Sequence, residues 1–147
     1  MITAYIDGGS RGNPGPAGFG VRVEDESGAV LGRFSGSVGT ATNNVAEYKG
    51  LIAALDWACA HGHRRVHIRS DSELLVRQMR GEYRVKNPGL QPLYQQAMEL
   101  AGRIGAVTFE HVRRELNADA DRLANEAMDA AAGEAAPGAS ITTPRQP

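Results

Sequence analysis

The sequence predicts an α/β protein built on one mixed five-stranded sheet that is flanked by helices. The 147 residues, 41% of them hydrophobic, suit one globular domain with a core of its own. Apolar residues alternate with other residues early in the chain, as in strands, and later recur every three or four residues, as in helices. The resulting order, βββαβααβα, contains a strand, a helix and a strand in succession, which implies a parallel pair joined by a right-handed crossover.

The first part of the chain is expected to form an antiparallel meander. Residues 1–7, 19–24 and 29–38 show the alternation of strands and are separated by short connections. The first connection, residues 8–16, is so rich in glycine and proline that we expect neither helix nor strand there.

The rest of the chain alternates helices with short strands. Asn44 and Asn117 are suitable N-caps for the first and last helices. The expected elements are a helix over 44–60, a strand over 66–70, a helix over 72–80, a helix over about 90–103, a strand over 106–112 and a helix from Asn117 to about Ala131.

Composition changes near the end of the chain. From Gly133 it becomes rich in Ala, Gly, Pro, Ser and Thr and has no periodicity. We therefore expect a domain over 1–132, followed by a disordered tail or linker over 133–147.

Composition also excludes several classes of protein. A single cysteine, Cys59, excludes a disulfide framework and a thiolate zinc cluster. No apolar run approaches the ~20 residues needed to cross a bilayer, and the first residues lack a signal pattern, so we expect a cytoplasmic protein without a membrane partner, and a monomer. The net charge of −1 argues against a protein that holds nucleic acid by a global positive field, so such binding would need local patches or metal ions.

Four carboxylates stand at the ends of predicted elements, and each has an ordinary structural interpretation. Asp7 ends the first strand and could be a turn residue, and Glu47 has the spacing of a capping box with the expected N-cap. Asp71 could cap the next helix. The dipole of the last helix could favour an acid at Asp121, and Asp119, on another face of that helix, is a competing candidate.

Taken together, these acids predict a metal site. Acids at the ends of two expected central strands and at the starts of two helices would form a cluster that repels itself unless divalent cations neutralise it. All-oxygen ligation suits Mg²⁺ or Mn²⁺ rather than zinc. Paired metals held in this way stabilise both the attacking and the leaving oxygen of a phosphodiester.

Four motifs resemble those of the ribonuclease H type 1 family and occur in that family's order. The resemblance covers roughly residues 1–131, and its motifs are YIDGGSRGNPG at 5–15, TNNVAE at 42–47, SDS at 70–72 and NADADRLA at 117–124.

This resemblance implies the ribonuclease H-like fold and a set of catalytic residues. Asp7, Glu47, Asp71 and Asp121 are implied as the catalytic, metal-binding carboxylates; Asp121 is preferred to Asp119 because Arg-Leu-Ala follows it. The implied reaction is hydrolysis of the RNA strand of an RNA–DNA hybrid, which leaves 5′-phosphate and 3′-hydroxyl ends. It would use two Mg²⁺ ions, which Mn²⁺ can replace.

Recognition of RNA requires a group that reads the 2′-hydroxyl, and neutral amides and main-chain groups suit that task. The resemblance places several such groups against the substrate minor groove, with Thr42 near a phosphate of the DNA strand. The alternative is that Asn13 only shapes a turn and Asn44 only caps a helix. The candidate substrate-binding residues are Ser10, Gly12, Asn13, Thr42, Asn43 and Asn44.

Two departures from the family matter. Many relatives carry a basic helical handle, whereas residues 81–90 are too few for an extra helix, although 64–86 holds seven basic residues against three acidic ones. Many relatives also have a His-containing loop before the last helix, whereas 112–117 has no His; Arg114 or Glu115 is a candidate for part of its role, and His111 is expected to be structural.

Other functions remain as alternatives. A nucleotide-triphosphate enzyme is discarded, because the Gly-rich segment 8–15 lacks the Gly-Lys-Ser/Thr ending and precedes a strand. A same-fold nuclease for DNA junctions shares the acids, and an inactive hybrid-binding module shares the fold. Domains of this family also occur fused to other enzymes, so a fused C-terminal domain beyond residue 147 stays as an alternative.

Overall fold

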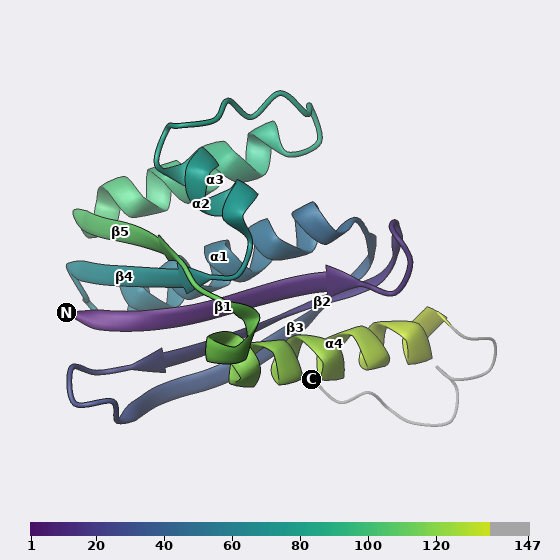
Figure 1. The fold of residues 1–147 in the computed structure, drawn as a ribbon, viewed down its shortest axis with the longest axis horizontal. Coiled ribbons are helices and arrows are strands. Elements are labelled where there is room, and N and C mark those ends of the chain that lie inside the picture. Colours follow the sequence, from purple (N-terminus) through teal and green to yellow (C-terminus); the bar gives the residue numbers. More distant parts are fainter. Residues whose placement is uncertain (136–147) are drawn as a thin grey trace.

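The computed structural model describes residues 1–135 and contains a single five-stranded sheet in the order β3-β2-β1-β4-β5 (Figure 1). β1, β2 and β3 are antiparallel neighbours, whereas β4 is parallel to β1 and β5 is parallel to β4. The predicted α/β class with a mixed five-stranded sheet is confirmed. The strands are β1 (Ile2–Ser10), β2 (Gly15–Glu24), β3 (Val30–Ala41), β4 (Arg65–Ser70) and β5 (Ala106–His111).

Four α-helices and one 3₁₀ turn, Arg114–Asn117, complete the described chain. No helix among residues 1–135 combines the length and the apolar character needed to cross a membrane. The helices are α1 (Asn43–Ala60), α2 (Glu73–Met79), α3 (Gln91–Ile104) and α4 (Ala118–Ala135).

The first hairpin is longer than the sequence predicts. β1 runs on to Ser10 and β2 starts at Gly15, so the expectation that 8–16 contains no strand is wrong. The pairing continues to Ser10 opposite Ala17, and the amide of Arg11 donates to the carbonyl of Pro16 at 2.8 Å. Cross-strand pairing overrides the low strand propensity of glycine, because that propensity reflects packing context more than the backbone itself.

The helix caps also differ from expectation. Thr42, not Asn44, is the N-cap of α1, and its hydroxyl accepts from the amide of Val45 at 3.2 Å. Ser72, which accepts from the amide of Leu75, caps α2. The expected cap Asn117 ends the 3₁₀ turn instead, and its side-chain amide donates to the carbonyl of Ile6 at 2.8 Å.

The last helix extends four residues beyond its expected end, to Ala135. Residues 133–135 of the expected tail therefore continue α4, and the rest of that tail, 136–147, lies outside the described residues. The tail stays a prediction.

Helices cover both faces of the sheet (Figure 1). α4 crosses one face at β1, β2 and β3, while α1 packs on the other face against the same strands and against α3. The apolar core lies between the sheet and α1, and its fully buried members include Ile6, Val21, Leu51, Leu55 and Ile68. The sheet thus forms the middle layer, and its central strand is β1.

Candidate active site

Two carboxylates stand where β1 and β4 separate. The parallel pairing of these strands ends at Ile6 opposite Ser70, and each of these two residues is followed by an acid, Asp7 and Asp71. β1 continues to Ser10, whereas β4 ends there. A crevice outside the carboxyl end of a parallel strand is a usual binding position in α/β sheets, and here it contains two acids.

Glu47 joins them because α1 approaches β1 unusually closely. A Cβ on Gly8 would lie 2.5 Å from the carbonyl carbon and oxygen of Ala46 and 2.6 Å from the amide nitrogen of Glu47. Only glycine fits between strand and helix at this point. With Thr42 as the cap, Glu47 is no longer at the third helical position, so the capping-box interpretation fails.

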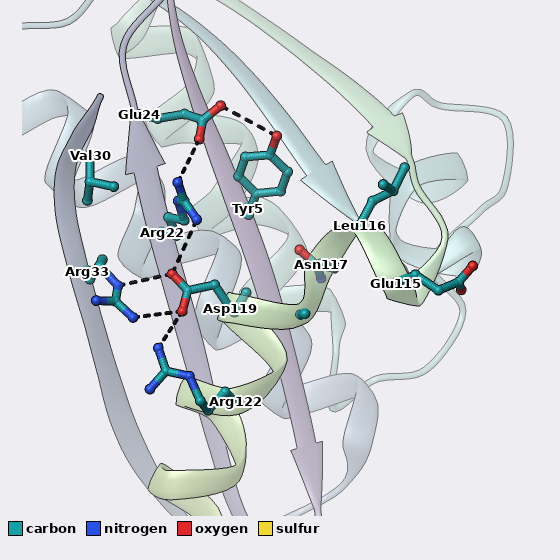
Figure 2. Close-up of a pocket in the computed structure, with 12 residues that line it drawn as sticks. Tyr5, Arg22, Glu24, Val30, Arg33, Glu115, Leu116, Asn117, Asp119 and Arg122 are labelled. Carbon is teal, nitrogen blue, oxygen red and sulfur yellow. Dashed lines mark hydrogen bonds and ion pairs between the residues drawn. The ribbon is translucent and has the colours of Figure 1, made fainter. Parts of the chain in front are cut away.

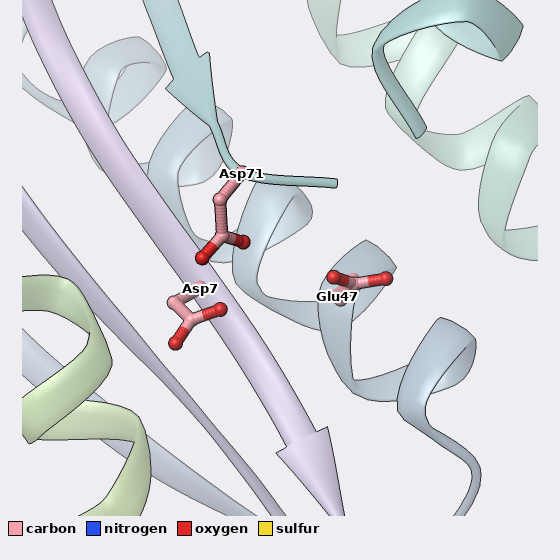
Figure 3. A group of neighbouring side chains, drawn as sticks. All are labelled: Asp7, Glu47 and Asp71. Atoms are coloured by element: carbon pink, nitrogen blue, oxygen red, sulfur yellow. The ribbon is translucent and has the colours of Figure 1, made fainter. Parts of the chain in front are cut away.

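The three side chains form one acidic cluster (Figure 3). One carboxylate oxygen from each of Asp7, Glu47 and Asp71 lies within 4.8 Å of the others. Oδ2 of Asp71 is buried and has no hydrogen-bond partner among the described residues; the guanidinium of Arg114 lies 3.9 Å away. An all-carboxylate set with an unpartnered buried oxygen fits a hard divalent cation.

Burial and mutual repulsion dominate the electrostatics of the acidic cluster. Burial, the largest cause, and next the charge of Asp71 contribute to a pKa of about 8 for Asp7. Burial also raises the pKa of Glu47 to about 7, against an opposing hydrogen bond from Ser72. The pKa of Asp71 is raised by burial too, although the cation of Arg114 opposes the rise. The cluster therefore resists full ionisation unless positive charge is supplied.

Asp121 approaches the acidic cluster from the other face of the sheet. Gly20 pairs with Asp7 across the β1–β2 ladder, and a Cβ on Gly20 would lie 2.4 Å from the carbonyl of Ala120 and 2.7 Å from the amide of Ala124. The first turn of α4 thus lies against the strand beside Asp7. A hydrogen bond with Asp121 and its charge both contribute to the raised pKa of Asp7.

Asp119, the competing acid, has different partners. Its carboxylate accepts from Nε of Arg33 at 3.0 Å and from Nη2 at 2.7 Å. Neighbouring cations, Arg33 foremost, hold its pKa below the usual range. Asp119 is therefore an ion-pair residue, while Asp121 stands beside Asp7. The catalytic roles of the four acids remain a prediction.

The expected substrate-binding residues are linked by hydrogen bonds at the end of β1. Oδ1 of Asn43 accepts from the amide of Ser10 at 2.9 Å and from its hydroxyl at 3.2 Å. Oδ1 of Asn13 accepts from the amide of Asn43 at 3.0 Å. Asn44 is exposed in the first turn of α1, and Gly12 adopts a positive φ of 84° between the strands. Thr42, by contrast, uses its hydroxyl in the cap of α1.

Two residues near the acidic cluster escaped the sequence reasoning. The hydroxyl of Ser72 bonds to Glu47, and the buried amide of Asn117 holds the strand next to Asp7. Ser72 belongs to the Ser-Asp-Ser motif, which could have drawn attention to it. Asn117 was interpreted only as a helix cap, because its contact with Ile6 spans 111 residues and no local pattern reveals it.

Comparisons with known proteins agree with this geometry. A family model described as reverse transcriptase-like matches residues 5–127. The chain is 52% identical over 137 residues to the bifunctional protein Rv2228c of Mycobacterium tuberculosis, covering 92% of this chain and 37% of that protein. The solved N-terminal RNase H domain of the same protein superposes with a TM-score of 0.87 at 50% identity and covers 92% of this chain and all of that one.

Two further relatives carry the ribonuclease H name. Ribonuclease HI of Halobacterium salinarum is 41% identical over 87% of this chain and 64% of its own length. LC11-RNase H1, solved in complex with an RNA/DNA hybrid, is 46% identical and has a TM-score of 0.85 over 90% of this chain and 99% of its own. The chain thus spans between a third and two thirds of the length of these curated relatives. Fold, motifs and relatives together show that the chain belongs to the ribonuclease H type 1 family.

Proposed function

We propose that this chain is an endoribonuclease that hydrolyses the RNA strand of RNA–DNA hybrids and leaves 5′-phosphate and 3′-hydroxyl ends. The observation that carries the proposal is the acidic cluster of Asp7, Glu47 and Asp71, with oxygens within 4.8 Å, where β4 ends beside the central strand. A relative of 46% identity has been solved with an RNA/DNA hybrid, which supports the substrate class.

Asp7, Glu47, Asp71 and Asp121 are the residues that would hold Mg²⁺, with Mn²⁺ as a substitute. When bound, paired ions of this kind stabilise the attacking and leaving oxygens of a phosphodiester. The chain supplies four carboxylates, and bound cations would relieve the charge repulsion within the acidic cluster as protonation does. Arg114, 3.9 Å from Asp71 and largely exposed, is placed to contact a scissile-strand phosphate.

Discrimination between RNA and DNA falls to the amides at the end of β1. The Oδ1 atoms of Asn43 and Asn13 are engaged within the protein, so their Nδ2 groups are the ones left to face a ligand. Nδ2 is a donor only. We therefore propose that Asn43 and Asn13 donate to acceptors in the minor groove, the 2′-oxygen of the RNA strand among them. Ser10, Gly12, Thr42 and Asn44 complete the proposed contact surface.

The DNA strand requires separate contacts, because the chain has no room for a handle at 81–90. Exposed Arg84 and Lys86 follow α2, while Arg77 is paired with Glu73 and Glu82. Such contacts to phosphates position the duplex without reading its sequence. We propose that this segment provides the DNA-strand contacts.

The deciding experiment compares labelled RNA–DNA hybrid, duplex RNA, duplex DNA and a four-way DNA junction, each with Mg²⁺ and with EDTA. We expect cleavage of the hybrid RNA strand alone, and only with metal. Cleavage confined to the junction would establish the DNA-junction nuclease instead, and hybrid binding without cleavage would establish an inactive binding module.

Three statements about the whole protein belong to the same proposal. We infer a cytoplasmic monomer, and a domain that includes the whole of α4, to Ala135, followed by a linker. The relative Rv2228c is longer and is named bifunctional, which supports the idea of a fused C-terminal domain.

A further inference from the structure

Asp119 stands at the centre of an arginine cluster beside the acidic cluster. Figure 2 shows Arg33 from β3, Arg22 from β2 and Arg122 from α4 converging on its carboxylate at the wall of a pocket of about 770 Å³. The bond with Arg33 is bidentate, at 3.0 and 2.7 Å, and Nη1 of Arg22 lies 3.6 Å away. The Asp119 side chain is only 20% exposed. Bidentate pairs of this kind fix orientation better than single contacts.

Glycines of β2 meet alanines of α4 at the interface between this helix and the sheet. A Cβ on Gly18 would lie 2.5 Å from Cβ of Ala127, and one on Gly20 would lie 2.4 Å from the carbonyl of Ala120. Glycine on the strand and alanine on the helix allow this close approach, and the hydroxyl of Ser37 donates to the carbonyl of Ala127 at 3.4 Å midway along the helix. Polar contacts at the start of α4 add a separate constraint on its first turn.

The described structure offers such contacts at the start of α4. Asp119 is tied to β2 and β3, and the amide of Asn117 is tied to β1. The exposed ion pair of Arg11 with Asp129, at 2.9 Å, lies more than two turns further along the helix and does not hold its first turn. Asp121 follows Asp119 by two residues in the same first turn, so any rotation there moves its carboxylate relative to Asp7.

We propose that Asp119 is a positioning residue, which holds the first turn of α4 through Arg33 and Arg22 so that the Asp121 carboxylate faces Asp7. In this role Asp119 acts through Asp121. This inference rests on the proposed function insofar as Asp121 is a metal ligand. It gives Asp119, two residues before Asp121, a role that the motif alone does not indicate.

The test compares Asp119→Asn and Arg33→Gln, which remove the same ion pair from its two sides. The matched control is Asp129→Asn, which removes an exposed ion pair further along the same helix. Mn²⁺ binding to the substrate-free protein is measured by calorimetry, and hybrid cleavage is measured as a function of Mg²⁺ concentration. Arg33→Gln keeps the Asp119 charge near the helix N-terminus, so it separates the ion pair from the helix-dipole effect.

We expect both variants to weaken Mn²⁺ binding about three- to tenfold, below the loss seen when a partner bonds directly to a metal ligand. The Mg²⁺ concentration for half-maximal cleavage should rise by a similar factor while KM for the hybrid stays constant. Asp129→Asn should change neither quantity.

Unchanged Mn²⁺ affinity in Asp119→Asn or Arg33→Gln would overturn the inference, as would an equal loss in Asp129→Asn. Failure of the proposed function is a separate outcome. In that case the unaltered protein does not cleave the hybrid, while the comparison of Mn²⁺ affinities still decides whether Asp119 positions the site.

Discussion

At the scale of single residues, the acidic cluster holds carboxylates that are buried and repel one another. Asp7 is only 9% exposed and carries a pKa raised to about 8 by burial and by neighbouring acids. Replacing one acid with its amide keeps the shape of the side chain and removes one of the repelling charges. Function and stability therefore make opposite demands on this position.

Asp7→Asn is expected to reduce hybrid cleavage to background while the metal-free protein unfolds at the same temperature or a higher one. Asp71→Asn should behave in the same way. Exposed Asp56 on α1 provides the control, since Asp56→Asn should leave both cleavage and Tm unchanged. Cleavage near the unaltered rate by Asp71→Asn would show that the metal-site assignment is wrong.

Asn43 has two functions that substitution can separate. Asn43→Asp keeps an acceptor for the amide of Ser10 but has no Nδ2 donor, while Asn43→Ala removes both. Both variants should slow cleavage several-fold, as expected for one hydrogen bond worth ~1 kcal/mol. Only Asn43→Ala should also lower Tm.

The substrate itself supplies the control for Asn43. A single 2′-deoxy substitution near the scissile bond should slow the unaltered protein but have a smaller effect on either variant. Equal losses in all three proteins would mean that Asn43 does not read this hydroxyl.

At the scale of elements, three glycines set the distances from which the site is built. Gly8 admits α1 to β1, and Gly18 and Gly20 admit α4 to β2. Each contact is between backbone atoms, or between backbone and a Cβ, so it has little freedom to adjust. These glycines bring acids from both faces of the sheet to the same end of one strand.

Gly8→Ala is expected to cost about 1–3 kcal/mol of unfolding free energy, because the new Cβ meets helix backbone at 2.5 Å. It should also reduce cleavage strongly, since α1 carries Glu47. Denaturant unfolding and hybrid cleavage measure the two effects.

The matched control is Gly102→Ala in α3, where a Cβ meets nothing within 4 Å. That change should stabilise the protein by up to about 1 kcal/mol and leave cleavage unchanged. A Gly8→Ala variant of unaltered stability and activity would contradict the close-approach argument.

At the scale of the whole molecule, the acidic cluster couples stability to pH and to metal. The pKa values of Asp7 and Glu47 are raised in the folded protein, to about 8 and about 7, above those of the unfolded chain. The folded state therefore holds more protons than the unfolded state between about pH 4 and pH 8. The stability that these two groups contribute is fully present below their pKa values in the unfolded chain. It is lost as pH rises through their pKa values in the folded protein.

The metal-free protein should accordingly have a lower Tm at pH 9 than at pH 6, and Mg²⁺ should raise Tm more at pH 9. Asp7→Asn should flatten both trends. Thermal unfolding in EDTA and in Mg²⁺ across this range provides the measurement. An unaltered protein whose Tm rises from pH 6 to pH 9 in EDTA would show that these carboxylates are not destabilised by burial.

The sequence by itself determined the order of the elements and the candidate acids. Periodicity is a local property, so alternation and helical spacing were enough to predict five strands and their helices. The four motifs were enough to identify Asp7, Glu47, Asp71 and Asp121 as candidate metal-binding acids, because each motif is a short continuous stretch of sequence. The uncertainty lay in the capping and turn functions that the same residues serve equally well.

Only the tertiary structure decided between those functions, because the deciding contacts join residues far apart in the chain. Thr42 is the N-cap of α1, so Glu47 is not part of a capping box and lies in the acidic cluster. Pairing with β2 extends β1 through a glycine-rich segment. Arg33 forms an ion pair with Asp119, 86 residues further along the chain. Gly20 allows the turn that carries Asp121 to approach the strand beside Asp7. Local preferences of about 1 kcal/mol are outweighed by such packing and pairing, which no window of sequence contains.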